Sequence, residues 1–139
     1  MCSSFKQELL GGVHDLDTHT LKIALIKSSM SGTYGAATTN YSDVTGNSDE
    51  ATGTNYSAGG QNLDSGTIAL SGTTATVDFA DEVFSNLTIT ARGAIIYNSS
   101  ASNKAIAVFD FGGDVSATSG DFTIVFPTAD ASNAVIRIA

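Results

Sequence analysis

The chain has 139 residues, the length of a single domain, and carries 14 acidic residues against six basic ones, for a formal net charge of −8 at pH 7. Nucleic acids and anionic membrane surfaces are bound by basic patches, so this charge argues against both as partners. The single cysteine, Cys2, cannot form an intramolecular disulfide. No apolar stretch approaches the roughly 20 residues of a membrane-spanning helix, and the N-terminus shows no secretory signal.

The start of the chain is predicted to be an N-terminal arm, residues 1–19, followed by a single β-sandwich domain, residues 20–139. Residues 5–10 (FKQELL) indicate one short helix with Ser4 as its N-cap. The Gly11–Gly12 pair would end this helix. A helix this short does not persist alone, so we expect it to dock on another surface.

Residues 20–27 (TLKIALIK) give the first strand pattern, and Ile26 adds an apolar residue to the polar face, which predicts cover on both faces. Residues 28–66 are rich in Ser, Thr, Gly and Asn and show little periodicity. A structureless loop of this length is uncommon in a compact domain, so we expect short edge strands near residues 41–44 and 61–63. Three tyrosines are expected to place their rings on the sheet and their hydroxyls in water: Tyr34, Tyr41 and Tyr56.

The second half of the chain has regular strand signals. The expected strands span residues 67–70, 74–80, 87–97, 104–111, 121–126 and 133–138. Gly93 interrupts the longest of them, which indicates a bulge or a close approach of another backbone segment. The Gly112–Gly113 pair is expected to end the strand that precedes it. Short strands separated by turns predict an all-β fold, either an antiparallel β-sandwich or a jelly-roll-like barrel with a short N-terminal helix.

The densest group of metal-ligating residue types is His14, Asp15, Asp17 and His19 (HDLDTH). Two imidazoles and two carboxylates are a suitable ligand set for a divalent cation. Their spacing fits no established zinc signature, so we favour a polar turn that leads into the first strand. We therefore assign no metal, cofactor or catalytic residue.

A second acidic group consists of Asp43, Asp49 and Glu50 in the weakly patterned segment. Carboxylate oxygens bind calcium, but this segment lacks the spacing of a calcium-binding loop. A solvated loop is the favoured interpretation.

Catalysis has little support in the sequence. No G-x-S-x-G motif occurs, and Cys2 lies in a terminus that we expect to be mobile, where an activated thiolate is not expected. Asp110 is flanked by aromatic residues in a strand, and we expect it to pair with Arg92 or Arg137. Paired carboxylates for sugar hydrolysis stay open as an alternative, and the candidates are Asp78, Asp81, Glu82 and Asp110. The glycosylation pattern N-x-[ST] occurs at Asn40, Asn55, Asn86 and Asn98, where without a secretion signal it indicates only polar turns.

Three stretches carry a resemblance to a known group of proteins. They are residues 5–26 (FKQELLGGVHDLDTHTLKIALI), the segment YSDVT at 41–45 with GTNYSAGGQNL at 53–63, and TITARGAIIYN at 88–98 followed by KAIAVFDFGGDVSATSGDFTI at 104–124. In this order they resemble small virion proteins of tailed bacteriophages. The sequence departs from that group at Gly93, where a bulky aromatic residue such as Tyr is usual.

The resemblance implies a structural component of the particle, similar in role to capsid decoration (cement) proteins, and no catalytic residues. The implied partners are the major capsid protein and further copies of the chain, as a homo-oligomer expected to be a trimer. The implied location is the capsid surface of the virion, after synthesis in the host cytoplasm. Residues 1–19 are a candidate capsid-gripping arm. Two alternatives stay open: a tail or neck component, and a carbohydrate-binding or adhesin module that uses the three tyrosines.

Overall fold

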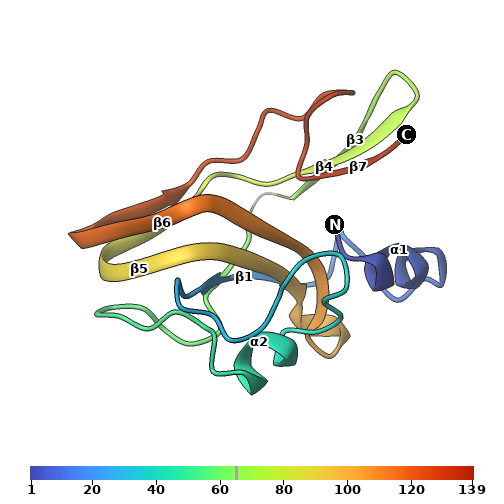
Figure 1. The fold of residues 1–139 in the computed structure, drawn as a ribbon. Helices are drawn as coiled ribbons and strands as arrows, with labels where there is room; N and C mark the ends of the chain where they lie inside the picture. The colour runs from blue at the N-terminus through green and yellow to red at the C-terminus, as the bar shows by residue number, and fades with distance from the viewer. Residues whose placement is uncertain (65) are drawn as a thin grey trace.

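The computed structural model describes residues 1–64 and 66–139, and Figure 1 shows their arrangement. The elements are α1 (Ser3–Leu10), β1 (Leu21–Ile26), α2 (Ser42–Gly46), β2 (Gln61–Asn62), β3 (Thr67–Ser71), β4 (Thr74–Asp78), β5 (Glu82–Asn98), η1 (Ser99–Ala101), β6 (Lys104–Ile124) and β7 (Ile136–Ile138). None of the described helices is both long and apolar enough to cross a membrane.

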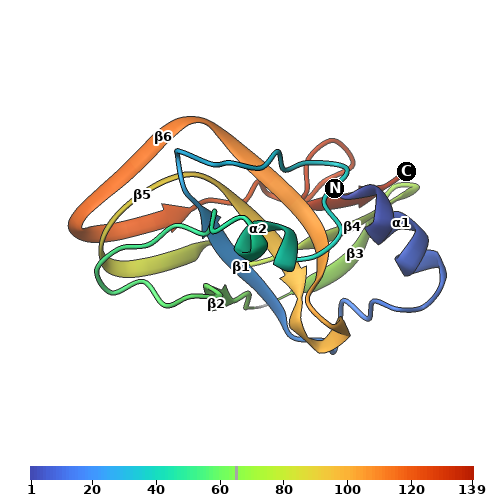
Figure 2. The same ribbon diagram turned by 60° about the horizontal axis from the view of Figure 1, so that its bottom comes forward.

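The strands form two antiparallel sheets. The large sheet has the order β2–β1–β5–β6, and the small sheet has the order β3–β4–β7. Residues 28–60 lie along one side of the large sheet, and the small sheet and α1 lie on the other (Figures 1 and 2). The expected all-β sandwich with a short N-terminal helix is confirmed; the sheets in the described residues stay separate and do not close into the jelly-roll-like barrel.

The centre of the large sheet is β1, which pairs with β2 and with the C-terminal half of β5. Ile23, Ala24, Leu25 and Ile26 are all buried, so successive side chains are covered although they point to opposite faces. This confirms the prediction that the strand is covered on both faces. A strand buried on both faces needs a layer on each side, and residues 28–60 provide one of them.

The longest element is the β5–β6 hairpin, which is strongly bent (Figure 1). Gly93 lies opposite Asp110 and Ala91 lies opposite Val115, so residues 111–114 bulge out of the ladder. A Cβ atom on Gly93 would lie 2.3 Å from the carbonyl oxygen of Phe109. Both expectations for this glycine, a bulge and a close backbone approach, are confirmed.

The predicted end of a strand at Gly112–Gly113 is wrong, because β6 continues through both glycines to Ile124. Gly112 has a φ of +79°, and its N–H donates to the Asp110 carboxylate at 2.8 Å. One residue in this conformation makes a bulge, and the ladder resumes beyond it. The strand predicted at residues 121–126 is therefore largely the last part of β6.

The weakly patterned segment contains one correct and one wrong prediction. β2 forms near residues 61–63 as expected, but residues 41–44 contribute to the helix α2 and not to a strand. The Asp43 carboxylate accepts hydrogen bonds from the N–H groups of Thr39 and Asn40, at 2.8 and 3.3 Å. Such local side-chain bonds to the backbone compete with strand pairing and favour a helical turn here.

The N-terminal arm is packed against the domain. Helix α1 begins one residue before the predicted cap, with Cys2 at the N-cap position, and its C-cap is Gly11 as predicted. The side chains of Cys2 and Phe5 are completely buried, and the Cys2 N–H donates to the carbonyl of Ile106 at 2.8 Å. The expectation of a mobile terminus around Cys2 is therefore wrong. Burial also raises the pKa of its thiol.

The small sheet has one apolar face made of two rows that cross its strands. Residues directly opposite each other share a face of the sheet. One row is Ile68, Val77 and Ile136, and the other is Leu70, Ala75 and Ile138. Val77 and Ile136 are buried, whereas Ile68 and Leu70 are 53% and 76% exposed. The apolar face is thus covered on one side and open to solvent along β3.

Candidate functional site

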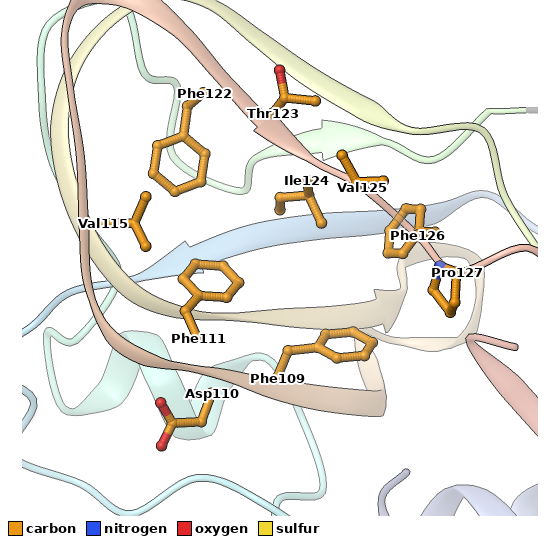
Figure 3. A pocket seen from close by; sticks show the side chains of 10 residues that line it. All are labelled: Phe109, Asp110, Phe111, Val115, Phe122, Thr123, Ile124, Val125, Phe126 and Pro127. Carbon is orange, nitrogen blue, oxygen red and sulfur yellow. The ribbon is translucent and has the colours of Figure 1, made fainter. Parts of the chain in front are cut away.

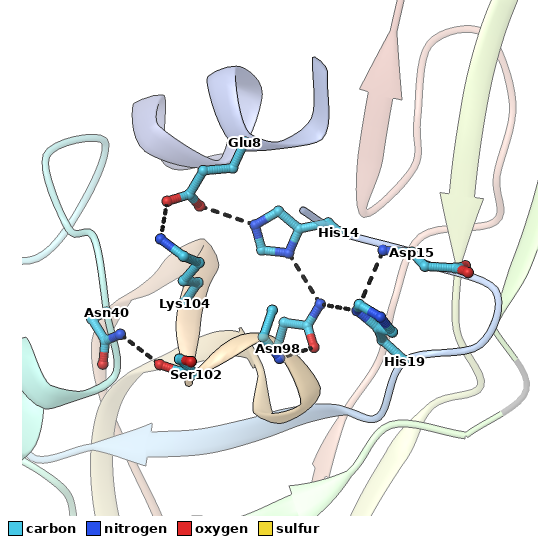
Figure 4. Close-up of polar contacts among 9 residues, drawn as sticks. Glu8, His14, Asp15, His19, Asn40, Asn98, Ser102 and Lys104 are labelled. Atoms are coloured by element: carbon cyan, nitrogen blue, oxygen red, sulfur yellow. Dashed lines mark hydrogen bonds and ion pairs between the residues drawn. The ribbon is translucent and has the colours of Figure 1, made fainter. Parts of the chain in front are cut away.

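The predicted metal-ligand residues lie in a turn between α1 and β1, where two of them join a buried polar network (Figure 4). His14 is buried, and its Nε2 lies 3.0 Å from Oε2 of Glu8. The Asp15 carboxylate accepts bonds from the N–H groups of Asp17 and Thr18 and from the Thr18 hydroxyl. The segment is the polar turn that the sequence favoured. No group of three or more His, Cys, Asp or Glu residues suited to a metal ion occurs in residues 1–64 and 66–139.

Asn98 determines the protonation pattern of both histidines. Its Oδ1 accepts from the Ala101 N–H at 3.1 Å, so its Nδ2 faces the rings. Nδ2 lies 3.1 Å from Nδ1 of His14 and 2.9 Å from Nδ1 of His19. An amide nitrogen only donates, so both Nδ1 atoms accept and each neutral ring carries its proton on Nε2. In sequence this asparagine was visible only as part of a glycosylation pattern.

Glu8 joins the arm to the hairpin at the other side of this network. Its carboxylate bonds His14 and also the ammonium of Lys104, with Nζ at 2.5 Å from Oε1 (Figure 4). Burial raises the pKa of Glu8, but the bonds from Lys104 and His14 outweigh it and lower the pKa below its usual value. The network therefore fixes the N-terminal arm on β5 and β6 through charge and hydrogen bonding, in addition to the packing of Phe5.

The side chain of Asp49 is fully buried, which contradicts the solvated loop favoured from the sequence. It accepts from the N–H groups of Ser31 and Gly32 at 2.9 and 2.8 Å and from the Tyr34 hydroxyl at 2.5 Å. The Lys27 ammonium lies 3.1 Å away. Burial raises the pKa of Asp49, but these donors outweigh it and hold the pKa well below its usual range.

The neighbouring Glu50 is also bound by groups of this chain. It accepts hydrogen bonds from the hydroxyls of Tyr41 and Tyr56 and from the Gly59 N–H. Burial and then Glu50 raise the pKa of Tyr41 well above its ordinary value, and similarly raise the pKa of Tyr97 to about 12. The prediction that tyrosine hydroxyls lie in water is therefore wrong, because they donate to the carboxylates of Asp49 and Glu50.

These contacts explain how residues 28–66 are held without long strands. The Tyr41 ring stacks on Tyr97, with centroids 4.4 Å apart and planes 8° from parallel. Tyr56 accepts from the Leu25 N–H of β1 at 2.9 Å while it donates to Glu50. Asp43 points elsewhere, toward Thr39 and Asn40, so the three acidic residues do not share a cation site. The cluster works as internal support for the segment.

The remaining candidate carboxylates lie in separate environments. Asp110 pairs with Arg92 across β5 and β6, with Nε to Oδ1 at 3.1 Å, as expected from the sequence. Arg137 instead donates to the carbonyl of Ala131. Asp81 accepts from the Phe126 N–H at 2.9 Å, and burial, then Asp64, raises the pKa of Glu82. Asp78 has one buried oxygen with no hydrogen-bond partner in the described part of the chain.

The surface has three apolar grooves of similar size. The first, with a volume of about 360 Å³, lies on the inner side of the bent β6 (Figure 3). Four phenylalanines dominate it: Phe109, Phe111, Phe122 and Phe126. The second and third, of about 360 and 330 Å³, lie between α1 or its following turn and the small sheet, and they share Leu9 and Ile138. The sequence indicated none of these grooves, because the first depends on the bend of β6 and the other two combine the N-terminal segment with the small sheet.

Comparison with known proteins assigns the chain to no family. No protein-family model, no curated protein and no solved structure matches the chain.

Proposed function

We propose that the chain is a non-enzymatic virion structural protein that decorates an assembled bacteriophage capsid and stabilises it. The sequence resemblance suggests the phage particle, and the exposed apolar face of the small sheet supports a role in binding another protein. Ile68 and Leu70 lie on one face of β3 and are largely exposed, and the strand carries no charged residue or proline. Natural proteins protect a free strand edge with such residues, so an unprotected apolar edge is typical of a surface that another protein covers.

The proposed mechanism is mass action. A protein that binds only the expanded lattice lowers the free energy of that lattice and raises its resistance to heat or dilution. The N-terminal arm is already packed on the domain through Cys2 and Phe5, so the capsid contact is assigned to the small sheet and not to a free arm.

The direct test is co-sedimentation with expanded capsids that lack decoration. The chain should pellet with them in saturable amounts and raise the temperature at which they disrupt. If the chain stays in the supernatant at every capsid concentration, the proposal is contradicted.

A matched pair of variants assigns the surface. Ile68→Thr/Leu70→Ser removes the exposed apolar side chains of β3 and should weaken capsid binding on the order of tenfold or more. Ala69→Ser changes the opposite face of the same strand and should bind normally. Equal binding by the two variants would exclude this face.

A tail or neck component remains the second candidate, since exposed apolar strands also suit rings and tubes. Its copy number in purified particles, measured by quantitative mass spectrometry, separates a few copies in a neck from the many copies of a decoration protein. The carbohydrate alternative needs the rings of Tyr34, Tyr41 and Tyr56 as stacking platforms, but all three pack partly buried against the core, and the Tyr41 ring already stacks on Tyr97.

A further inference from the structure

Glu82, the first residue of β5, is a buried carboxylate that this chain leaves without a partner. It is only 7% exposed, and its side chain forms no hydrogen bond and no ion pair with any described residue. By contrast, Glu8, Asp49 and Glu50 each accept from two or more donors of the chain. An ionised carboxylate is costly to bury without compensation, so Glu82 must take up either a proton or a cation.

The charged group that acts on Glu82 is a second carboxylate. Burial and then the charge of Asp64 raise the pKa of Glu82, and no basic side chain of the described residues contributes. The Ala80 N–H donates to the carbonyl oxygen of Asp64 at 3.1 Å, so Asp64 lies beside the chain two residues before Glu82. Asp64 is exposed, and its carboxylate likewise forms no hydrogen bond or ion pair with a described residue. Two carboxylates without partners, one buried and one open to solvent, therefore lie close enough to repel each other.

A cation shared by the two carboxylates removes both unfavourable effects. It neutralises the buried charge of Glu82, and it replaces the repulsion from Asp64 by attraction to a common ion, whereas a proton on Glu82 removes only the first charge. In a chain of net charge −8, the surrounding potential also concentrates cations. We propose that Asp64 and Glu82 together bind one divalent cation between the end of β2 and the start of β5.

The donor atoms indicate the class of cation. Carboxylate oxygens are the ligands that Mg²⁺ and Ca²⁺ prefer, whereas zinc and copper favour imidazole and thiolate ligands. Neither a histidine nor a cysteine is among the groups that act on Glu82. The two carboxylates are fewer than the three side chains of a closed metal site, so water completes the coordination, as is usual for Mg²⁺ beside one or two carboxylates.

A site with two protein ligands binds weakly, with an expected dissociation constant on the order of 1 mM. The bound ion links the segment that follows β2 to the first residue of β5, and it stabilises the fold because the unfolded chain does not hold the two carboxylates together. Neither a capsid nor another copy of the chain takes part, so this inference does not rest on the proposed function.

The test is thermal denaturation of the full chain at neutral pH, followed by circular dichroism. The chain is first treated with EDTA and then measured in MgCl2, in CaCl2, and in NaCl of equal ionic strength. At about 10 mM, at least one of the divalent salts should raise the midpoint by roughly 3–6 °C relative to NaCl. Excess EDTA should reverse the rise.

Three variants assign the response to these residues. Glu82→Gln keeps the shape of the side chain, and it should lose the response while melting at or above the wild-type temperature in EDTA, because no ionised carboxylate stays buried. Asp64→Asn, at an exposed position, should also lose the response. Asp81→Asn is the matched control: it removes one charge from the neighbouring residue, and its amide oxygen can still accept from the Phe126 N–H. Asp81 does not act on Glu82, so this variant should respond like wild type.

Three results would overturn the inference. The first is a wild-type chain that responds to neither divalent salt more than to NaCl, which would mean that Glu82 carries a proton instead. The second is a full response in Glu82→Gln or in Asp64→Asn, which would place the ion elsewhere on the acidic surface. The third is an equal loss of response in Asp81→Asn, which would show that the effect follows net charge and not these two carboxylates.

Discussion

The large sheet buries carboxylates, whereas the small sheet exposes isoleucine and leucine. Asp49 lies fully buried beside the large sheet with its donors in place, and Leu70 on the small sheet is 76% exposed. Burying a charge costs free energy unless partners satisfy it, so the Asp49 region must be assembled from groups of this chain. Exposed apolar side chains in a row instead favour contact with another molecule. The Asp49 region is thus stabilised by groups of this chain, whereas the exposed face of the small sheet favours contact with a second molecule.

The largest effect should come from removing the buried charge. Asp49→Ala leaves Lys27, the Tyr34 hydroxyl and the backbone donors of Ser31 and Gly32 without their acceptor. Deleting one partner of a fully buried pair costs about 3–5 kcal/mol in the free energy of unfolding, and we expect the lower end of this range because the Lys27 side chain is 33% exposed. Urea denaturation followed by circular dichroism measures this loss. Asp114→Ala, at an exposed position, is the control and should stay within about 0.5 kcal/mol of wild type.

Acid should reproduce part of this effect in the unmodified chain. The pKa of Asp49 is lower in the folded than in the unfolded protein, so its contribution is complete above the unfolded value of about 4. It is lost as the pH falls below that value toward the folded pKa, because the unfolded state then binds the proton more readily. Unfolding free energies measured from neutral to acidic pH should fall less steeply for Asp49→Asn than for wild type. Parallel curves would show that other carboxylates cause the acid sensitivity.

The third effect concerns the bend of the β5–β6 hairpin. Gly93→Ala would place a methyl group 2.3 Å from the Phe109 carbonyl oxygen, so the two strands must separate locally. Overpacking of this kind costs about 1–3 kcal/mol. Gly113→Ala is the matched control, since nothing lies within 4 Å of its added atom. If thermal denaturation gives the same midpoint for both variants, the strands at Gly93 are looser than the distance implies.

The sequence predicted the features that depend on local pattern. Alternation located β1 and residues 87–97 of β5, and the lone Gly93 predicted the bulge correctly. The prediction of a strand at residues 41–44 failed because the residue pattern does not reveal the hydrogen bond that the Asp43 carboxylate accepts from a backbone N–H group. This hydrogen bond favours α2. The two glycines of β6 predicted the end of a strand, because a glycine pair in sequence does not distinguish a turn from a bulge.

The surfaces could not be predicted in the same way. The sequence predicted a solvated loop at Asp49 and Glu50. Their hydrogen-bond partners are tyrosines in irregular segments, whose positions in the fold cannot be read from the sequence pattern. The third groove combines a helix near one terminus with a strand near the other, through Lys6 and Arg137. Burial and groove lining arise from contacts between distant segments, and periodicity within a segment carries no information on them.

The smallest effect should come from the small sheet, through a leucine pair that differs only in its surroundings. Leu87 on β5 is 1% exposed, and Leu70 on β3 is 76% exposed. Leu87→Ala should lower the free energy of unfolding by about 2–5 kcal/mol, because it leaves a cavity in the core. Leu70→Ala should change it by no more than about 0.5 kcal/mol in the monomer, because the side chain is already largely in water. Urea denaturation at low protein concentration, where copies of the chain are separate, makes this comparison. A loss above 2 kcal/mol for Leu70→Ala would mean that β3 is already covered within one molecule, and the proposal that it awaits a partner would fail.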